Sequence, residues 1–535
     1  MKDRVSLTDF LMYHKETHPI SFHMPGHKGR STLYGIYGFG DFVKNVVGND
    51  ITEIPGADAL QQPRERIKDI MEGYAGLYGA KHTELLVNGS SAGLMASILG
   101  SVPRGGKLLM GRNSHKSVYG ALRLGGIDPV YIMPEIDGET GLQLGLDPDK
   151  IEAALIEDGG IKAVLVTSPN YYGVLSDIER IASIVHLHGR ILIVDQAHGA
   201  HLKFFDYLRS EDGLPHRAAE NCGADIVVDS AHKTLLSFTG SAILNICTER
   251  PDVSRISELL RMLQTTSPSY LLMGSLDINQ QILRMDGYNL IKNWDADIKY
   301  FYEEAAQIAG LGLIDRIDLD ETKVSITMSA LGLSGPELAE ELEKRNIWVE
   351  LTHGDYVMLM TGIGNERGDY EDVLSALRDL SAHHGGRIQG VEPESSASKT
   401  EPAAQNMAQK QAKNEAQAMA KNEAQAANKN ASQPVDKIAE LRTPSSDSAL
   451  IERLEQRKIP DTYEEVPLYS AEGRVLYESI IPYPPGTPIA CPGEVLSKSV
   501  ILYVRDQLVA QHVVLGVDEE GRVKVESDCV LFKEI

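Results

Sequence analysis

The stretch DIVVDSAHKTLLSFTGSAILNI, residues 225–246, holds two short apolar runs that flank one lysine, Lys233. Both runs are mostly continuous rather than alternating in apolar character, as expected of strands buried on both faces of a sheet. Lys233 follows the first run, where an amine is costly to bury without a chemical role. A Schiff base to a carbonyl cofactor is one such role, whereas a lone lysine at such a place is more often an exposed loop residue.

Five further runs of this kind precede the stretch, and helical segments separate most of them. Alternating strands and helices imply βαβ crossovers, and so a mainly parallel, seven-stranded sheet in an α/β domain. The run 241–246 follows its predecessor too closely for a crossover helix, which makes it a candidate for an antiparallel strand. The five runs are 84–87, 107–110, 129–133, 162–166 and 190–194.

Composition and pattern divide the 535 residues into an arm, a large domain, a small domain, a linker and a C-terminal domain. The linker is rich in Ala, Gln, Asn, Lys and Glu and has little apolar surface to bury. The small and C-terminal domains mix strand-like runs with helical stretches, which predicts α+β folds. The boundaries are 1–65 for the arm, 66–265 for the large domain, 266–390 for the small domain, 391–438 for the low-complexity linker and 439–535 for the C-terminal domain.

Charge and composition exclude several classes of partner. With 52 basic and 76 acidic residues the formal net charge is −24, whereas binding to nucleic acids or anionic membranes requires a basic surface. The sequence contains no run of 18 apolar residues, the length that could span a membrane. The N-terminal residues lack the apolar core of a signal peptide. The four cysteines have the spacing of neither a disulfide framework nor a metal site. We therefore expect a cytoplasmic protein with no metal ion, nucleic acid or membrane as partner.

An aspartate ends the predicted strand 190–194. In RILIVDQAHGAH this residue is Asp195, and the carboxyl ends of parallel strands border the crevice where ligands bind. Such a carboxylate can pair with a pyridinium nitrogen and keep it protonated, which makes the ring an electron sink. An aspartate that caps a helix or a turn gives the same local pattern.

A turn of small residues follows the predicted strand 84–87. In ELLVNGSSAGLMASIL it presents Ser90, Ser91, Ala92 and Gly93 at the start of a helix. Free N–H groups and the helix dipole at that point favour a phosphate. An ordinary strand-to-helix turn with a serine cap is the alternative.

A histidine, His115 in GRNSHKSVYGAL, lies at the next predicted strand-to-helix turn. Its imidazole is suited to stacking on a planar ring, and a capping or solvent-facing histidine is the alternative. Each of these signals is weak alone. Together they place a phosphate turn, a stacking ring, Asp195 and Lys233 at one edge of the sheet, which favours a pyridoxal-phosphate site.

Four segments carry a resemblance to a known family. They closely resemble motifs of the Orn/Lys/Arg decarboxylases, which are fold-type I pyridoxal-phosphate enzymes, in the short branch that lacks an amino-terminal wing domain. The resemblance runs from about residue 5 to 535 apart from the linker, and it implies an aspartate-aminotransferase-like large domain. The segments are SFHMPGHKG (21–29), DQAHGAH (195–201), SAHKT (230–234) and YPPGTPIACPGE (483–494).

The resemblance implies a role for each matched residue. Lys233 would carry the cofactor as a Schiff base, Asp195 would contact the pyridine nitrogen, and His115 would stack on the ring. A segment like QTTSPSY (264–270) reaches the phosphate from the partner subunit in the family, which implies a homodimer or higher homo-oligomer with shared active sites. The remaining cofactor contacts would be His198, Ser90, Ser91, Ala92, Ser230 and, from the partner, Thr266.

Two departures from the family pattern bear on the substrate rather than on the cofactor. Gln196 stands where the short branch usually has Glu. In GADALQQP (56–63), Ala59 and Gln61 replace an acid and a histidine.

The reaction implied is decarboxylation of a basic L-amino acid in polyamine biosynthesis. Arginine, which would give agmatine, is the first choice, followed by lysine and ornithine, which would give cadaverine and putrescine. Lys233 or His232 would return the proton to Cα, and Glu494 and Asp58 are candidates to bind the basic side chain. A structural contact between the C-terminal domain and the rest of the chain is the alternative for Glu494. Transamination or aldol cleavage on the same fold, and a non-catalytic binding protein, are the other functions considered.

Overall fold

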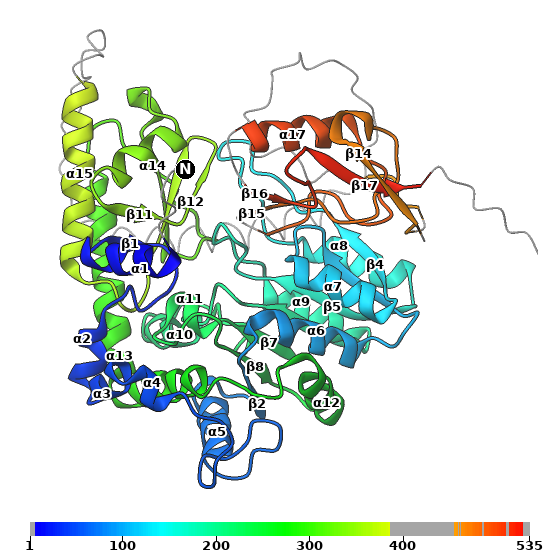
Figure 1. Cartoon of the computed structure of the whole chain (residues 1–535), viewed down its shortest axis with the longest axis horizontal. Helices are drawn as coiled ribbons and strands as arrows, with labels where there is room; N and C mark the ends of the chain where they lie inside the picture. Colours follow the sequence, from blue (N-terminus) through cyan, green and yellow to red (C-terminus); the bar gives the residue numbers. More distant parts are fainter. Residues whose placement is uncertain are drawn as a thin grey trace, which may run out of the picture.

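The computed structural model describes residues 6–385 and 454–527, leaving out 458, 461, 484–485 and 510–512. The predicted linker, 391–438, lies outside the described residues. Figure 1 shows a central sheet with its helices, a second group of elements around α14 (Gly335–Glu343) and α15 (Arg367–Gly385), and a C-terminal group around α17 (Lys498–Val509). We refer to residues 66–263 as the large unit, 312–385 as the small unit and 454–527 as the C-terminal unit.

The large unit is built on a seven-stranded sheet with the order β2-β8-β7-β6-β5-β3-β4. Strand β8 runs antiparallel to both of its neighbours, and all the other pairings are parallel. The predicted mainly parallel sheet and the antiparallel last strand are therefore confirmed. The strands are β2 (His82–Leu86), β3 (Lys107–Gly111), β4 (Asp128–Ile132), β5 (Ile161–Thr167), β6 (Ile191–Asp195), β7 (Ile226–Asp229) and β8 (Ala242–Ile246).

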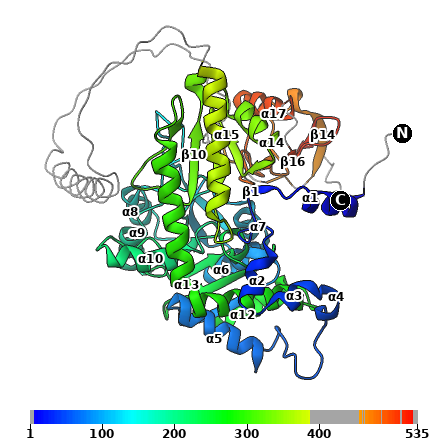
Figure 2. The same cartoon turned by 90° about the vertical axis from the view of Figure 1, so that its left-hand side faces the viewer.

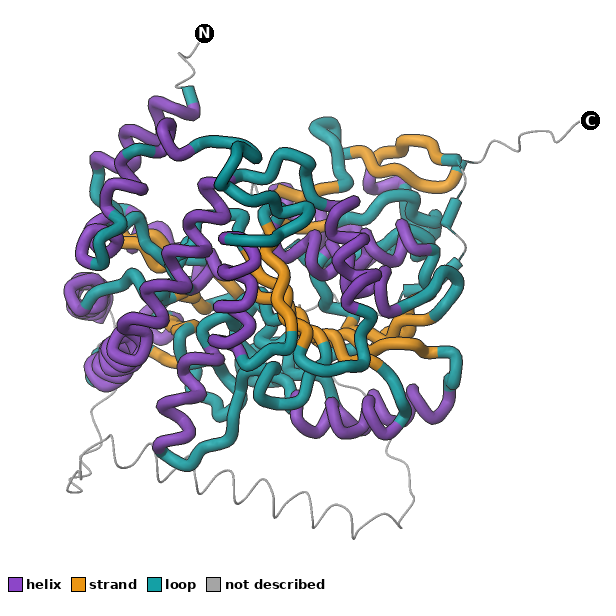
Figure 3. Tube along the Cα trace, turned by 90° about the horizontal axis from the view of Figure 1, so that it is seen from below, coloured by secondary structure: helices purple, strands orange, loops and turns teal. Residues whose placement is uncertain are grey.

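Helices cover both faces of this sheet, as Figure 3 shows. In β6, Ile193 packs into the core that contains α6, α7 and α12, whereas Leu192 and Val194 pack into the core that contains α8 and α9. Successive strand residues point to opposite faces, so a strand covered on both sides needs apolar residues in succession. The helices are α5 (Arg66–Tyr78), α6 (Gly89–Ser101), α7 (Lys116–Gly125), α8 (Pro148–Glu157), α9 (Ile178–Leu187), α10 (Leu202–Glu211), α11 (Ala231–Thr234) and α12 (Val253–Leu263).

The small unit holds a four-stranded sheet with the order β12-β13-β10-β9. The long helix α13 (Tyr270–Ala305) leads into it and runs beside α15 (Figure 2). The apolar run 347–351 is divided between β11 and β12, with Glu350 between them. The other elements are β9 (Gly312–Leu313), β10 (Lys323–Thr327), η1 (Ser329–Leu331), α14 (Gly335–Glu343), β11 (Ile347–Val349), β12 (Leu351–His353), β13 (Tyr356–Met360) and α15 (Arg367–Gly385).

The N-terminal segment lies against the small unit, because β1 pairs in parallel with β11. This pairing brings residues 20–25 next to the division between β11 and β12. The elements of the segment are α1 (Leu7–Glu16), β1 (Ile20–Phe22), α2 (Ser31–Ile36), α3 (Gly40–Lys44) and α4 (Val46–Asn49).

The C-terminal unit has two antiparallel strand pairs and a core of its own, in which Leu476, Val500 and Val525 are buried. This α+β arrangement matches the predicted fold class. Within the part of the chain that the structure describes, no helix is long and apolar enough to cross a membrane. The elements are β14 (Tyr463–Pro467), η2 (Leu468–Ser470), β15 (Ile481–Tyr483), α17 (Lys498–Val509), β16 (Val513–Leu515) and β17 (Arg522–Glu526).

Candidate functional site

A cavity of about 630 Å³ lies where the parallel strands of the large unit end. Thr167 and Asp195 are the last residues of β5 and β6, and Ser230 follows β7. The small unit closes the cavity with Glu350, and the C-terminal unit contributes Thr487. Most of the predicted site residues line this one cavity, namely Ser90, Ser91, His115, Asp195, His198, Ser230, His232 and Lys233.

Lys233 lies on the short helix α11 and extends its amine towards His198, with 2.9 Å between Nζ and the imidazole Nε2. Burial lowers the pKa of Lys233, although the carboxylates of Asp195 and Glu350 act in the opposite direction. A lowered pKa favours the uncharged amine, which is the nucleophilic form. Lys233 is therefore chemically suited to attack a carbonyl group in this cavity.

Asp195 is almost fully buried, with 3% of the residue exposed. Its Oδ1 accepts a hydrogen bond from the backbone N–H of Ala197 at 3.2 Å. Burial raises the pKa of Asp195, while Lys233 and the Ala197 N–H act in the opposite direction. A carboxyl group held in this way at a cavity wall is a suitable partner for a protonated ring nitrogen.

His115 is both a helix cap and a cavity residue. It is the N-cap of α7, and its Nδ1 accepts a hydrogen bond from the backbone N–H of Ser117 at 3.2 Å. Burial, together with the positive charges of Lys233 and Lys116, lowers the pKa of His115 to about 3. The imidazole is therefore a neutral, flat ring at neutral pH, which is suited to stacking.

The start of α6 has the properties of an anion site. Its N-cap, Asn88, makes no side-chain capping bond, and Ser90 and Ser91 of the first turn line the cavity. The buried hydroxyl of Ser230, which also lines the cavity, has no hydrogen-bond partner among the described residues. First-turn N–H groups together with an unpaired hydroxyl are what a phosphate would satisfy. Ala92 lies in the same turn but does not line the cavity.

Two residues of the small unit reach the site without having been predicted. Glu350 accepts hydrogen bonds at 2.9 Å from the backbone N–H of Met24 and from the hydroxyl of Tyr171. Lys323, the first residue of β10, is fully buried, with its Nζ 2.9 Å from His198 Nδ1. The only sequence signal for either residue is a charge within a strand-like apolar run.

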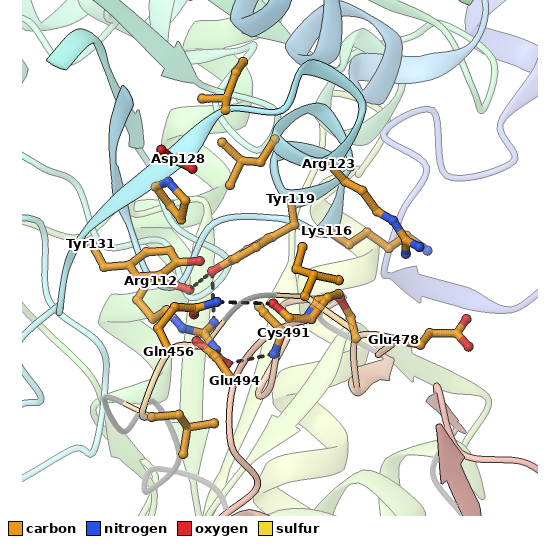
Figure 4. Close-up of a pocket in the computed structure, with 18 of the residues that line it drawn as sticks. Arg112, Lys116, Tyr119, Arg123, Asp128, Tyr131, Gln456, Glu478, Cys491 and Glu494 are labelled. Carbon is orange, nitrogen blue, oxygen red and sulfur yellow. Dashed lines mark hydrogen bonds and ion pairs between the residues drawn. The ribbon is translucent and has the colours of Figure 1, made fainter. Parts of the chain in front are cut away.

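Glu494 lies elsewhere, in a buried ion pair with Arg112 at 2.8 Å. Figure 4 shows Arg112 and Tyr119 of the large unit meeting Glu494 and Cys491 of the C-terminal unit. They line a second cavity, of about 1040 Å³. Glu494 thus makes the structural contact that was the alternative to substrate binding, since its counter-charge lies 382 positions away in sequence.

Asp58 and Thr266 are also outside the Lys233 cavity of this chain. Asp58 accepts hydrogen bonds from the backbone N–H groups of Glu65 and Ile67 at 2.9 and 3.0 Å. It therefore organises the start of α5, where orphan N–H groups need acceptors. Thr266 is exposed in the segment after α12, and its contact with the cofactor of a partner subunit stays a prediction.

Comparisons with known proteins agree with this geometry. The family model described as "Orn/Lys/Arg decarboxylase, major domain" matches residues 5–311, and the one described as "Orn/Lys/Arg decarboxylase, C-terminal domain" matches residues 447–516. The chain is 30% identical to an arginine decarboxylase of Bacillus subtilis over 95% of this chain and 94% of that protein. It is 29% identical to an arginine decarboxylase of Bacillus anthracis, with the same coverage.

Solved structures share the fold at lower identity. Lysine decarboxylase A of Pseudomonas aeruginosa superposes with a TM-score of 0.66 at 19% identity, covering 97% of this chain and 80% of that one. The lysine decarboxylase of Francisella novicida gives a TM-score of 0.67 at 17% identity, covering 93% and 76%. The large unit therefore has the fold-type I architecture, and the chain is a carboxy-lyase for a basic amino acid. With a family model matched over more than half of its length, the chain belongs to the Orn/Lys/Arg decarboxylase family.

Proposed function

We propose that the chain decarboxylates arginine to agmatine with pyridoxal 5′-phosphate attached to Lys233. The observation that carries the proposal is the convergence of Lys233, Asp195, His115 and the start of α6 on one cavity. Support for arginine comes from relatives of 29–30% identity that are named arginine decarboxylases. The same site supports the coarser function, decarboxylation of a basic amino acid, whichever substrate is preferred.

The residues of the cavity divide the work of holding the cofactor. The cofactor, when bound, supplies an electron sink for the electron pair that remains after CO₂ leaves. Asp195 would keep its ring nitrogen protonated, and His115 would cover one face of its ring. Ser90, Ser91 and Ser230 would hold its phosphate, which gives the unpaired Ser230 hydroxyl a partner.

Glu350 is our candidate for the residue that binds the basic side chain. Among the described residues, only two carboxylates line the cavity, Asp195 and Glu350. If Asp195 serves the ring nitrogen, Glu350 is left to face the substrate's cation. Its hydrogen-bond partners, the Met24 N–H and the Tyr171 hydroxyl, are neutral donors, so a guanidinium group would add a charged hydrogen-bond donor. We propose Glu350 in this role in place of Glu494 and Asp58.

Lys233 is a better proton donor to Cα than His232. The Nδ1 of His232 lies 2.8 Å from the carbonyl oxygen of Ser241 and must therefore carry the proton of that bond. Burial lowers the pKa of His232 to about 4, against the effect of that hydrogen bond, so its Nε2 carries no proton near neutrality. Lys233 keeps N–H groups in both charge states. The homodimer with shared sites, and the cytoplasmic location, stay predictions.

A substrate panel tests the proposal. The purified chain with added pyridoxal phosphate should release CO₂ fastest from arginine, with lysine and ornithine slower. Lys233→Ala should lose turnover together with the absorbance of the bound cofactor near about 420 nm. Faster release from lysine or ornithine would contradict the choice of arginine, and retention of the band in Lys233→Ala would contradict the attachment site.

A further inference from the structure

His198 lies between two lysines that come from different units. Its Nε2 is 2.9 Å from Lys233 Nζ, and its Nδ1 is 2.9 Å from Lys323 Nζ. Lys323 also donates to the carbonyl oxygen of Tyr171 at 2.8 Å, and it is fully buried. The Tyr171 ring meets the His198 ring edge-on, with 4.9 Å between their centroids and an interplanar angle of 77°. The three nitrogen-bearing groups therefore form a fixed chain.

The hydrogen-bonding capacity of these groups limits their charge. A lysine ammonium has three donors and no acceptor, and a neutral imidazole has one donor and one acceptor. With both hydrogen bonds made, the lysine that accepts from the N–H of His198 must be a free amine, and when the two lysines share one positive charge the other is the ammonium. In the first arrangement, Lys233 is the ammonium and the Nδ1–H of His198 donates to Lys323. In the second, Lys323 is the ammonium and the Nε2–H of His198 donates to Lys233.

We propose that this chain is a proton relay that discharges Lys233 into Lys323 through His198. One N–H bond of the Lys233 ammonium breaks as the Nε2–H bond of His198 forms. The Nδ1–H bond breaks as a third N–H bond forms on Lys323. The total charge is unchanged and no other reactant is needed. Lys233 thus becomes a free amine without a water molecule to take its proton. Lys233 needs this free-amine form whenever it attaches the cofactor, and in this respect the inference rests on the proposed function.

Burial and nearby charges act on both amines of the relay. Burial lowers the pKa of Lys323 to about 7, with Asp320 and Glu350 opposing this and Lys233 adding to it. At neutral pH Lys323 is therefore able to accept a proton. Burial also lowers the pKa of Lys233, against Asp195 and Glu350, so burial favours the free amine at both ends of the relay.

His198 itself stays neutral, as a relay requires. Burial lowers its pKa well below the usual value, and so do Lys233 and Lys323, with smaller contributions from His115 and His232. An imidazolium would have no acceptor to offer either lysine. The Oδ1 of Asp320 accepts a hydrogen bond from the Thr322 hydroxyl at 2.8 Å and lies 3.2 Å from Nε2 of His201. Among the described residues, no side-chain hydrogen bond joins Asp320 to Lys323 or His198, so its charge acts on the relay through space.

The test is the pH dependence of cofactor uptake by the full chain. The rate is followed by absorbance, and attachment at Lys233 is verified by mass spectrometry after borohydride reduction. Lys323→Met removes the proton acceptor and its charge, so the pH at half-maximal rate should rise by about one unit. Lys323→Arg places a permanent cation there, which fixes the proton of His198 on Nε2, so the midpoint should fall by a similar amount.

Lys28 provides a matched control. It is also buried, and its Nζ donates to the carbonyl oxygens of His23 and Met360 at 2.6 and 2.9 Å, not to His198. Burial lowers its pKa to about 7 as well, against Glu350 and Asp369. Lys28→Met should therefore leave the midpoint within about 0.3 unit of the original chain.

The two Lys323 variants separate a relay from a purely structural role. Opposite shifts show that the charge at position 323 sets the protonation of Lys233, as the relay requires, whereas shifts in the same direction, or no shift in Lys323→Met, overturn it. Thermal melting shows which variants fold. Lys323→Gln replaces Lys323→Met if the methionine variant does not fold. If neither uncharged variant folds, the direction in which Lys323→Arg shifts the pH midpoint decides the question. If the original chain takes up no cofactor at any pH, the proposed function itself fails, which is a distinct result.

Discussion

The buried ion pair between Arg112 and Glu494 gives a stability prediction that can be worked out from the structure. The two side chains are 2% and 3% exposed and 2.8 Å apart. Glu494→Ala would leave the Arg112 guanidinium buried without its counter-charge. Breaking a buried pair from one side costs about 3–5 kcal/mol in the free energy of unfolding.

The remaining partners of Arg112 place the expected loss at the lower end of that range. Its guanidinium also donates to the Tyr119 hydroxyl at 2.9 Å and to the carbonyl oxygens of Pro488 and Ile489 at 2.8 and 3.3 Å. We therefore expect about 3 kcal/mol for Glu494→Ala. Glu494→Gln keeps the shape and one acceptor oxygen for the Cys491 N–H, so we expect about 2 kcal/mol.

The loss should appear as detachment of the C-terminal unit, because Pro488, Ile489, Cys491 and Glu494 all belong to it. Urea unfolding followed by two probes should separate into two transitions, since independently unfolding units are not two-state. Limited proteolysis should release residues C-terminal to the linker earlier than in the original chain. The cofactor should also bind more weakly, because Arg112 is three positions from His115 and the C-terminal unit contributes Thr487 to the cavity.

Two controls bracket this prediction. Glu340→Gln disrupts an exposed pair with Lys344 (3.0 Å), and it should change the free energy of unfolding by less than about 0.5 kcal/mol. Arg112→Met combined with Glu494→Leu removes both charges and should restore much of the stability lost in Glu494→Ala. If Glu494→Ala has the same urea-unfolding curve and the same rate of proteolysis as the original chain, the ion pair does not hold the C-terminal unit and the reasoning is refuted.

Three further predictions concern the Lys233 cavity. Asp195→Asn should still bind cofactor, seen by absorbance, but lose most turnover, because an amide does not hold the ring nitrogen protonated. In steady-state assays, Glu350→Gln should raise the KM for arginine about 10- to 100-fold. This is the effect of losing a hydrogen bond between charged groups that contributes about 1.5–3 kcal/mol. Burial lowers the pKa of His115 from 6.5 to about 3 in the folded chain. As the pH falls, His115 therefore takes up a proton in the unfolded chain before it does so in the folded chain. Folding stability should therefore fall by up to about 1.4 kcal/mol per unit as the pH drops from 6.5 towards 3, less steeply in His115→Asn, as measured by urea unfolding.

The parts of the site that follow strand ends could be predicted from the sequence. Asp195, Ser230 and Lys233 come directly after buried runs, and the carboxyl ends of neighbouring parallel strands meet at one edge of the sheet. The pattern of apolar runs places these residues together without any knowledge of side-chain contacts. The antiparallel β8 could be predicted for a similar reason, because its connection to β7 is too short for a crossover helix.

The residues contributed by the small unit could not be predicted in this way. Glu350 lies within WVEL (348–351), and a single charge in such an apolar run predicts a residue on the exposed face of a strand. The sequence gives no sign of the division between β11 and β12. Lys323 opens a strand and reads in the same way. Glu494 has the right chemistry for a substrate contact, but its partner Arg112 is 382 positions away, so only the folded chain shows that its charge is already balanced.

This division between the units has a consequence for substrate choice. In the proposed function, the large unit supplies the groups that would hold the cofactor, whereas the charge that would face the substrate comes from Glu350 in the small unit. Glu350 is held by Met24 of the N-terminal segment and by Tyr171, and Met24 is placed there because β1 pairs with β11. Discrimination among arginine, lysine and ornithine is therefore expected to follow residues 20–25 and 348–351 rather than the strand ends that hold the cofactor.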